Sequence, residues 1–171
     1  MQPKKYVLLG HSDGGSIATI FAGSEQAENL KDNLQGIILL APHFFVEDVS
    51  IESIRLAGEQ YKAGQLRQQL AFYHGQNVDQ TFYGWHDAWL LEPFRDWQIK
   101  ACLAAVQVPI LGLQGTNDAY GTALQLESIL ELRPKLGTIH FLADCGHNVF
   151  RDDMVTSLAH ITSFLNKHNI A

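Results

Sequence analysis

The sequence predicts an α/β fold, with a parallel sheet of about four strands flanked by helices. Four short stretches with strand character, the first two typical of buried strands, alternate with stretches that have helical spacing. This alternation favours a parallel sheet with helices on both faces. Residues 43–106 contain no comparable strand and indicate a helical insertion. We therefore expect a sheet domain over 1–42 and 107–171, with a helical cap over 43–106.

Composition limits the classes of function. The chain has 171 residues, of which 46% are hydrophobic, enough for one globular core. A net charge of −6 without a basic tract argues against binding to nucleic acid or to an anionic membrane. No run is long enough to span a bilayer or to act as a signal peptide. Cys102 and Cys145 lack metal-ligand spacing, so no metal site is expected. Two thiols in a chain without a signal peptide predict a reducing compartment, and we expect a cytoplasmic protein without a cofactor.

The first strand leads into a serine motif. An apolar run over 6–9 stops at Gly10, and Ser12 follows in a G-x-S-x-G pattern that Gly14 completes. A strand, a sharp turn and a helix are the structural context in which this motif exposes a nucleophilic serine. We expect the two glycines to remove Cβ atoms that would clash in so tight a turn. Ser12 is therefore a candidate nucleophile at the carboxyl end of the strand.

The next elements complete the first part of the sheet. A helix is expected over 14–22, with its apolar side chains packed against the sheet. These are Ile17, Ala18, Ile20 and Phe21. The polar stretch 25–35 is expected on the surface. The continuous apolar run 36–41 is typical of a strand buried on both faces, and Pro42 ends it.

The insertion has two helical patterns. In the first, Ser50 is the expected N-cap and Gly64 the terminator. In the second, four apolar residues share one face at i, i+4, i+7 and i+11, and Pro93 breaks the helix. They are Val78, Phe82, Trp85 and Trp89. Most of these aromatics are interpreted as packing residues within the cap, while Trp85 and Trp89 are also candidates for substrate binding.

Strand and helix alternate again in the second half of the chain. Strands are expected over 108–113 and 138–142, separated by a helix over 124–132. The inward residues of that helix are expected to be Leu126, Ile129 and Leu130. A closing helix starts near Asp152 and Asp153, whose carboxylates suit the positive end of a helix dipole. It is expected to bury Val155, Leu158, Ile161 and Leu165.

Two polar residues follow the third and fourth strands. Asp118 comes just after the third strand and His147 just after the fourth. Because the carboxyl ends of parallel strands lie at one edge of a sheet, both loops can meet the serine turn. Acyl transfer by serine needs a base for the hydroxyl proton and a carboxylate that orients this base. Ser12, His147 and Asp118 are therefore the candidate catalytic triad.

Other residues near these loops have alternative interpretations. Asp144 could replace Asp118 as the acid, although it precedes the turn, and Cys145 could be a nucleophile, although no elbow surrounds it. The backbone N–H of Asp13, directly after the serine, is the expected oxyanion-hole donor. His43, just past Pro42, is a candidate for substrate binding and equally a bystander.

The serine motif, the order serine, acid, histidine and the helical insertion resemble the α/β-hydrolase superfamily. The resemblance covers the whole chain but only the carboxyl-terminal part of the family fold, since the four strands look like its fifth to eighth. It implies a serine hydrolase that acts through an acyl-enzyme on a small ester, thioester, amide or activated C–C bond, and needs no cofactor. It also implies that the amino-terminal strands, with the loop that supplies a second oxyanion donor, are missing.

Two further expectations follow from that resemblance. The alternative to a hydrolase is a truncated, non-catalytic remnant or a binding module that keeps the triad residues. The apolar edge strand over 6–9 would expose unpaired backbone groups and wet apolar faces. We therefore expect a homo-oligomer, or association with a separate amino-terminal segment.

Overall fold

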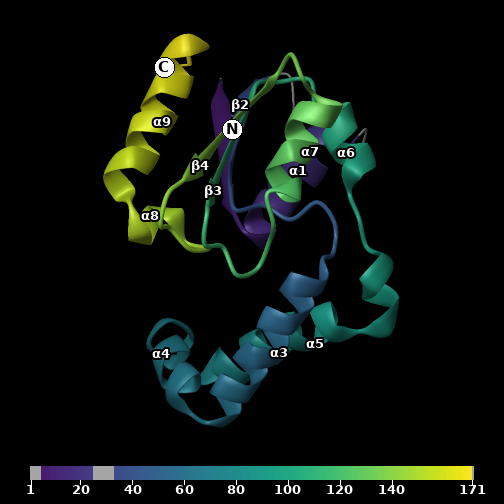
Figure 1. Ribbon diagram of the computed structural model, residues 1–171, viewed down its shortest axis with the longest axis vertical. Helices are drawn as coiled ribbons and strands as arrows, with labels where there is room; N and C mark the ends of the chain where they lie inside the picture. Colours follow the sequence, from purple (N-terminus) through teal and green to yellow (C-terminus); the bar gives the residue numbers. More distant parts are fainter. Residues whose placement is uncertain (1–4, 25–32, 171) are drawn as a thin grey trace. The chain divides into compact units, whose positions relative to one another are not determined.

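A four-stranded parallel sheet organises the fold. The computed structural model describes residues 5–24 and 33–170 of the chain. The strands follow one another in the order β1-β2-β3-β4, and each pairs in parallel with the next (Figure 1). They are β1 (Tyr6–His11), β2 (Leu34–Leu40), β3 (Ile110–Gly115) and β4 (Gly137–Leu142). The predicted fold class is confirmed, whereas most of the polar stretch expected over 25–35 lies outside the described residues.

The chain divides into two compact units. The sheet unit comprises residues 1–45 and 98–171, and the helical unit comprises residues 46–97. The sheet unit is thus larger than the expected domain, which ended at residue 42 and resumed at 107. Helix α6 (Lys100–Ala105), which falls within the range expected for the cap, packs against α1 and α7 of the sheet unit.

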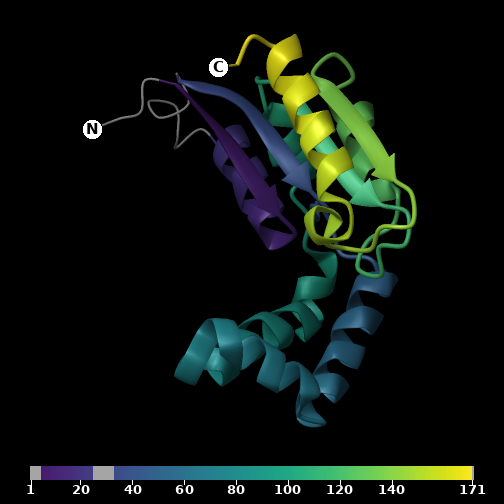
Figure 2. The ribbon, with the colours of Figure 1, turned by 90° about the vertical axis from the view of Figure 1, so that its left-hand side faces the viewer.

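Helices cover both faces of the sheet. One face carries α1 (Asp13–Gly23), α6 and α7 (Leu124–Leu132), and the other carries α8 (Val149–Asp152) and α9 (Met154–Lys167) (Figures 1 and 2). Strand β2 lies between two neighbours, and its residues from Gly36 to Leu40 are all buried. This explains why its sequence is a continuous apolar run and not an alternating one.

Three expected helix faces are wrong in part. In α1, Ala18 is buried but Ile17 is 66% exposed. In α9, Ile161 is buried but Val155 is 80% exposed, because the buried stripe consists of Ser157, Ile161 and Phe164. Leu158, Ile20 and, in α7, Leu130 are also exposed. Apolar spacing predicts the buried face of a helix only approximately. Small or polar residues, such as Ser16 in α1 and Ser157 in α9, lie on the buried faces instead.

The helical unit consists of three α-helices and two short 3₁₀ turns. Its elements are α3 (Asp48–Lys62), α4 (Gln65–His74), η2 (Gly75–Asn77), α5 (Val78–Leu90) and η3 (Glu92–Asp96). Helix α3 begins at Asp48, so Ser50 is a buried residue inside it and not the expected N-cap. In α5 the predicted face is confirmed, since Val78, Phe82 and Trp89 are buried. Helix α4 was not predicted, because none of its residues is buried.

Among the described residues, no helix is both long and apolar enough to cross a membrane.

Candidate active site

Ser12 occupies a strained turn between β1 and α1. Its backbone has φ 54° and ψ −123°, a conformation that non-glycine residues rarely adopt and that is found where function requires it. The turn is anchored because the N–H of Ser12 donates to the carbonyl oxygen of Leu40 at 2.9 Å. The side chain of Ser12 is thereby placed at the carboxyl edge of the sheet.

Only one of the two glycines around Ser12 has the predicted role. A Cβ atom on Gly10 would lie 2.2 Å from the carbonyl oxygen of Gly14, so this position requires glycine. A Cβ atom on Gly14 would meet nothing within 4 Å, so the expectation for Gly14 is wrong. The second close approach is at Gly15, where a Cβ atom would lie 3.0 Å from the Cβ of Pro42. The turn is therefore tight against its own strand and against the end of β2.

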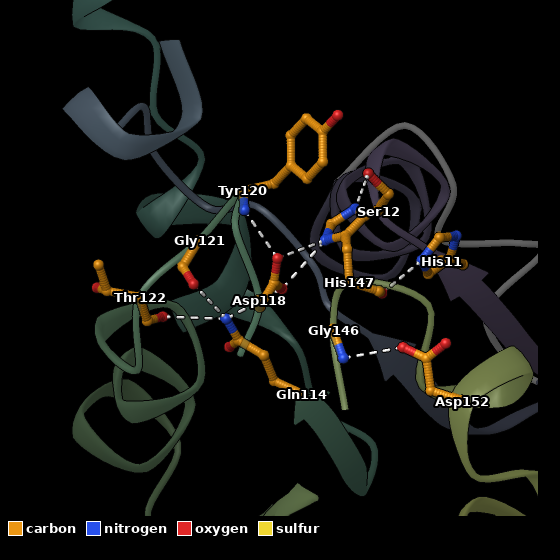
Figure 3. A network of polar contacts seen from close by, with 10 residues as sticks. All are labelled: His11, Ser12, Gln114, Asp118, Tyr120, Gly121, Thr122, Gly146, His147 and Asp152. Atoms are coloured by element: carbon orange, nitrogen blue, oxygen red, sulfur yellow. Dashed lines mark hydrogen bonds and ion pairs between the residues drawn. The ribbon is translucent and has the colours of Figure 1, made fainter. Parts of the chain in front are cut away.

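The three predicted triad residues lie within hydrogen-bonding distance (Figure 3). Nε2 of His147 is 2.9 Å from Oγ of Ser12, and Nδ1 is 2.9 and 3.0 Å from the carboxylate oxygens of Asp118. Because a carboxylate only accepts, Nδ1 carries a proton and Nε2 is left to accept from the serine hydroxyl. This tautomer is the one in which the imidazole can remove the hydroxyl proton.

Asp118 is a buried carboxylate with several donors. Its side chain is 2% exposed and, besides His147, it accepts from the N–H of Tyr120 at 2.8 Å and from Nε2 of Gln114 at 3.3 Å. Gln114 is itself buried in β3 and also donates to the carbonyl oxygens of Gly121 and Thr122 (Figure 3). These bonds orient the carboxylate toward His147. Sequence reasoning missed Gln114, whose only signal was a polar residue at the end of an apolar run.

The loop that carries His147 is held at several backbone atoms. The carbonyl oxygen of Cys145 accepts from the N–H of Asn117 at 2.9 Å, and the N–H of Gly146 donates to Asp152 at 2.8 Å. A Cβ atom on Gly115 would lie 2.1 Å from the carbonyl oxygen of Cys145, so this glycine allows the two loops to meet. The pKa of Asp152 is lowered, first by the Gly146 N–H and then by Arg151.

Three aromatic rings surround the imidazole of His147. Ring centroids of Tyr120, His11 and His43 lie 4.8, 5.0 and 5.6 Å from that of His147. Nε2 of His11 is 2.9 Å from the carbonyl oxygen of His147, to which it donates. Burial lowers the pKa of His11 and raises that of Tyr120. Tyr120 was not predicted from the sequence, because nothing in its spacing distinguishes it from a loop residue.

The other candidates from the sequence near these loops are Asp144, Cys145 and Asp13. Asp144 is an exposed residue with φ 59°, and its N–H donates to Thr116 at 3.0 Å, while Asp118 and not Asp144 bonds to His147. Cys145 is buried, and burial followed by Asp153, Asp152 and Asp144 raises the pKa of its thiol, which disfavours the reactive thiolate. Asp13 is the first residue of α1.

The two candidate tryptophans belong to the helical unit. Trp89 is buried, with ring centroids 5.2 Å from Phe94 and 6.0 Å from Trp97. Trp85 is half-buried, and its ring lies 5.8 Å from that of Phe82. Both therefore pack within the helical unit. Over the described part of the chain, no group of three or more histidine, cysteine or acidic side chains could hold a metal ion.

Solved structures share this architecture. A serine hydrolase involved in carbazole degradation (CarC) superposes with a TM-score of 0.69 at 18% identity, covering 95% of this chain and 64% of that one. E-2-(acetamidomethylene)succinate hydrolase gives 0.67 at 17% identity, covering 95% and 67%. An α/β fold family hydrolase of Bacillus anthracis gives 0.60 at 21% identity, covering 96% and 67%. The chain has the α/β-hydrolase fold.

The likeness is one of structure and not of sequence. No family model matches the chain, and no curated protein matches it either. The chain spans about two thirds of the length of the α/β-hydrolase structures that it resembles, between 64% and 67%. At these identities the comparison establishes the fold, and the activity has to be argued from the site.

Proposed function

We propose that the protein is a serine hydrolase that acts through an acyl-enzyme on a small carboxylic ester, or on a related thioester, amide or activated C–C bond. The observation that carries this proposal is the continuous hydrogen-bonded chain from Ser12 through His147 to Asp118. The strained turn of Ser12 also supports the proposal, because it holds the hydroxyl at the carboxyl edge of the sheet. Hydrolases of the same fold are consistent with this activity.

The first half of the reaction forms the acyl-enzyme. Oγ of Ser12 attacks the substrate carbonyl carbon while Nε2 of His147 takes the hydroxyl proton, and Asp118 stabilises the resulting imidazolium. The N–H of Asp13, at the positive end of α1, is the donor that we assign to the oxyanion. The tetrahedral intermediate then collapses. The bond to the alcohol breaks, and the alcohol leaves with the proton from Nε2.

The second half restores the enzyme. Nε2 of His147 takes a proton from water as the water oxygen attacks the acyl carbon. The second tetrahedral intermediate expels Oγ of Ser12, which recovers the proton, and the carboxylic acid is released. No group other than the triad, the oxyanion donor and water is required for this balance. His43, Trp85 and Trp89 remain candidates for contacts with the substrate.

Labelling with a fluorophosphonate probe tests the proposal. We expect the probe to modify Ser12 of the folded chain, as peptide mass spectrometry would show, and the Ser12→Ala variant to resist labelling. Ser163→Ala is a matched control, because Ser163 is an exposed serine of α9, and it should label like the wild type. Hydrolysis of p-nitrophenyl acetate should disappear in Ser12→Ala and in His147→Ala.

The same experiment discriminates the alternative function. A folded chain whose Ser12 resists the probe and that hydrolyses no ester would be a non-catalytic remnant or a binding module. Hydrolysis that persists in Ser12→Ala would show that another residue carries the chemistry. Double variants should be no worse than single ones, because triad members act as a unit.

A further inference from the structure

We propose that His11 is a positioning residue for the triad, which fixes the loop of His147 to the serine turn through one hydrogen bond. This inference rests on the proposed hydrolase function. It follows from the contact between Nε2 of His11 and the carbonyl oxygen of His147, at 2.9 Å (Figure 3). His11 directly precedes the nucleophile, so the bond joins the two segments whose side chains must exchange a proton.

The geometry explains why such a bond is needed. Ser12 is carried by β1, whereas His147 follows β4, at the other edge of the sheet. The hydrogen bonds that hold the neighbours of His147 reach Asn117 after β3 and Asp152 in α8, away from the serine turn. The His11 bond, in contrast, joins the backbone of His147 directly to the residue before Ser12. A shift of about 1 Å between reacting groups can cost about 100-fold in rate.

Its surroundings keep His11 in the required form. A carbonyl oxygen only accepts, so Nε2 of His11 carries a proton. Among the described residues, the charged or titratable groups that influence the pKa of His11 are His147, from the loop after β4, whose charge lowers it, and Asp118, from the loop after β3, whose charge raises it. Burial is the largest influence on the pKa of His11 and lowers it, so the ring is neutral near neutral pH. A neutral ring donates to the loop without opposing the positive charge that His147 acquires in the reaction.

Two substitutions separate the hydrogen bond from the bulk of the side chain. His11→Leu removes the donor, while His11→Gln keeps an N–H at a similar distance from the backbone. With p-nitrophenyl acetate we expect His11→Leu to lower kcat by about 10- to 100-fold with little change in KM. His11→Gln should recover most of kcat. The matched controls are His140→Leu and His140→Gln, since His140 is a partly buried histidine of β4 that stacks on His160, outside the site.

The kinetic outcomes distinguish this proposal from the proposed function. If Ser12→Ala retains hydrolysis, the serine mechanism is wrong. If Ser12→Ala is inactive but His11→Leu is no slower than His140→Leu, the hydrolase proposal stands and the positioning role is wrong. Equal losses in His11→Leu and His11→Gln would also overturn the role of the donor.

Nitrogen-15 spectroscopy of the imidazole rings provides a test that needs no activity. His11 should be the neutral tautomer with its proton on Nε2, and a proton on Nδ1 would overturn the proposal. The Nδ1 proton of His147, which bonds to Asp118, should exchange faster with water in His11→Leu than in the wild type or in His11→Gln. Unchanged exchange in His11→Leu would likewise exclude the positioning role.

Discussion

The two units of the molecule hold their residues in place by different means. In the sheet unit the closest approaches are between backbones. Cβ atoms on Gly10, Gly23 and Gly115 would lie 2.1–2.2 Å from carbonyl oxygens. In the helical unit the close approach is to a side chain, since a Cβ on Gly58 would lie 2.4 Å from Nε2 of His86. Backbones cannot yield as side chains can, so the sheet unit can hold reacting groups with precision while the helical unit relies on packed aromatic rings.

The largest effect is expected for a carboxylate of the sheet unit. Asp118→Asn should lower kcat by about 10⁴-fold, because an amide can stabilise the wrong tautomer of His147 and cannot balance its charge. The fold should survive, since the remaining side-chain oxygen can still accept from the Tyr120 N–H or from Gln114, which bond to different oxygens of Asp118. Steady-state kinetics and circular dichroism would check both statements. A mild loss of kcat would mean that another acid, such as Asp144, supports the histidine.

Asp79 is the carboxylate of the helical unit that we compare with Asp118, because it is held by several hydrogen bonds but lies outside the triad. Asp79 accepts two bonds from Arg67 and one from Tyr61, which lower its pKa to about 2. Because the folded pKa is below the usual 3.8, the stabilisation is present above that value and is lost as the pH falls toward 2. Asp79→Asn should therefore lower the thermal stability at neutral pH and remove this acid dependence, while the kcat of the folded protein stays unchanged. Thermal unfolding followed from neutral to acidic pH would check this, and a variant as stable as the wild type would contradict it.

The tryptophans distinguish packing from substrate binding. Trp89→Ala should cost about 3–5 kcal/mol of stability, because Trp89 is buried against Phe94 and Trp97. Trp85→Ala should cost less, because Trp85 is only half-buried. Chemical denaturation measures both. A variant that raises KM without loss of stability would instead identify a substrate contact, as the sequence allowed for either residue.

Glycine substitutions test the backbone contrast directly. Gly115→Ala should cost about 3 kcal/mol or more, since its Cβ would lie 2.1 Å from the carbonyl oxygen of Cys145. A Cβ atom on Gly84 in α5 would meet nothing within 4 Å, so Gly84→Ala should stabilise the helix by about 0.5–1 kcal/mol. Urea denaturation would compare the two. Equal tolerance at both sites would contradict the backbone contact assigned to Gly115.

The smallest expected effect concerns assembly through the sheet unit. Among the described residues β1 pairs with β2 alone, and an apolar groove of about 370 Å³ lies beside it, lined by Val7, Ile38, Ile161, Leu165 and Ile170 among others. We propose that a second copy of the chain covers this surface in a weak dimer, as expected from the apolar edge strand. Sedimentation velocity at micromolar concentration should show the dimer.

A matched pair of edge substitutions locates that contact. Leu9 on β1 is 54% exposed and Phe141 on β4, at the opposite edge, is 40% exposed. Leu9→Lys should give a monomer, while Phe141→Lys should leave the dimer intact. A wild-type protein that is monomeric at all concentrations would contradict the proposal.

Local sequence patterns determined much of this protein. The strands follow from short apolar runs, of which the first two end at Gly10 and Pro42. The runs of β2 and β3 are the most apolar because these two strands are buried on both faces, whereas β1 and β4 are only partly buried. The places of Ser12, Asp118 and His147 follow as well, because parallel strands bring their carboxyl ends to one edge. The buried face of α5 could also be predicted, since Val78, Phe82 and Trp89 repeat with the helical period.

How those residues are held follows from contacts between elements that are distant in the sequence. That Gln114 orients Asp118 depends on how the loop after β3 folds back on its strand. The bond from His11 to His147 joins the end of β1 to the loop after β4, at opposite edges of the sheet. The sequence also does not show that Pro42 leaves little room for a side chain at Gly15. Nor does it show that Val155 is exposed, although the helical spacing of apolar residues predicted that it is buried. Periodicity constrains each element on its own. Which atoms meet across elements depends on the packing of all of them at once.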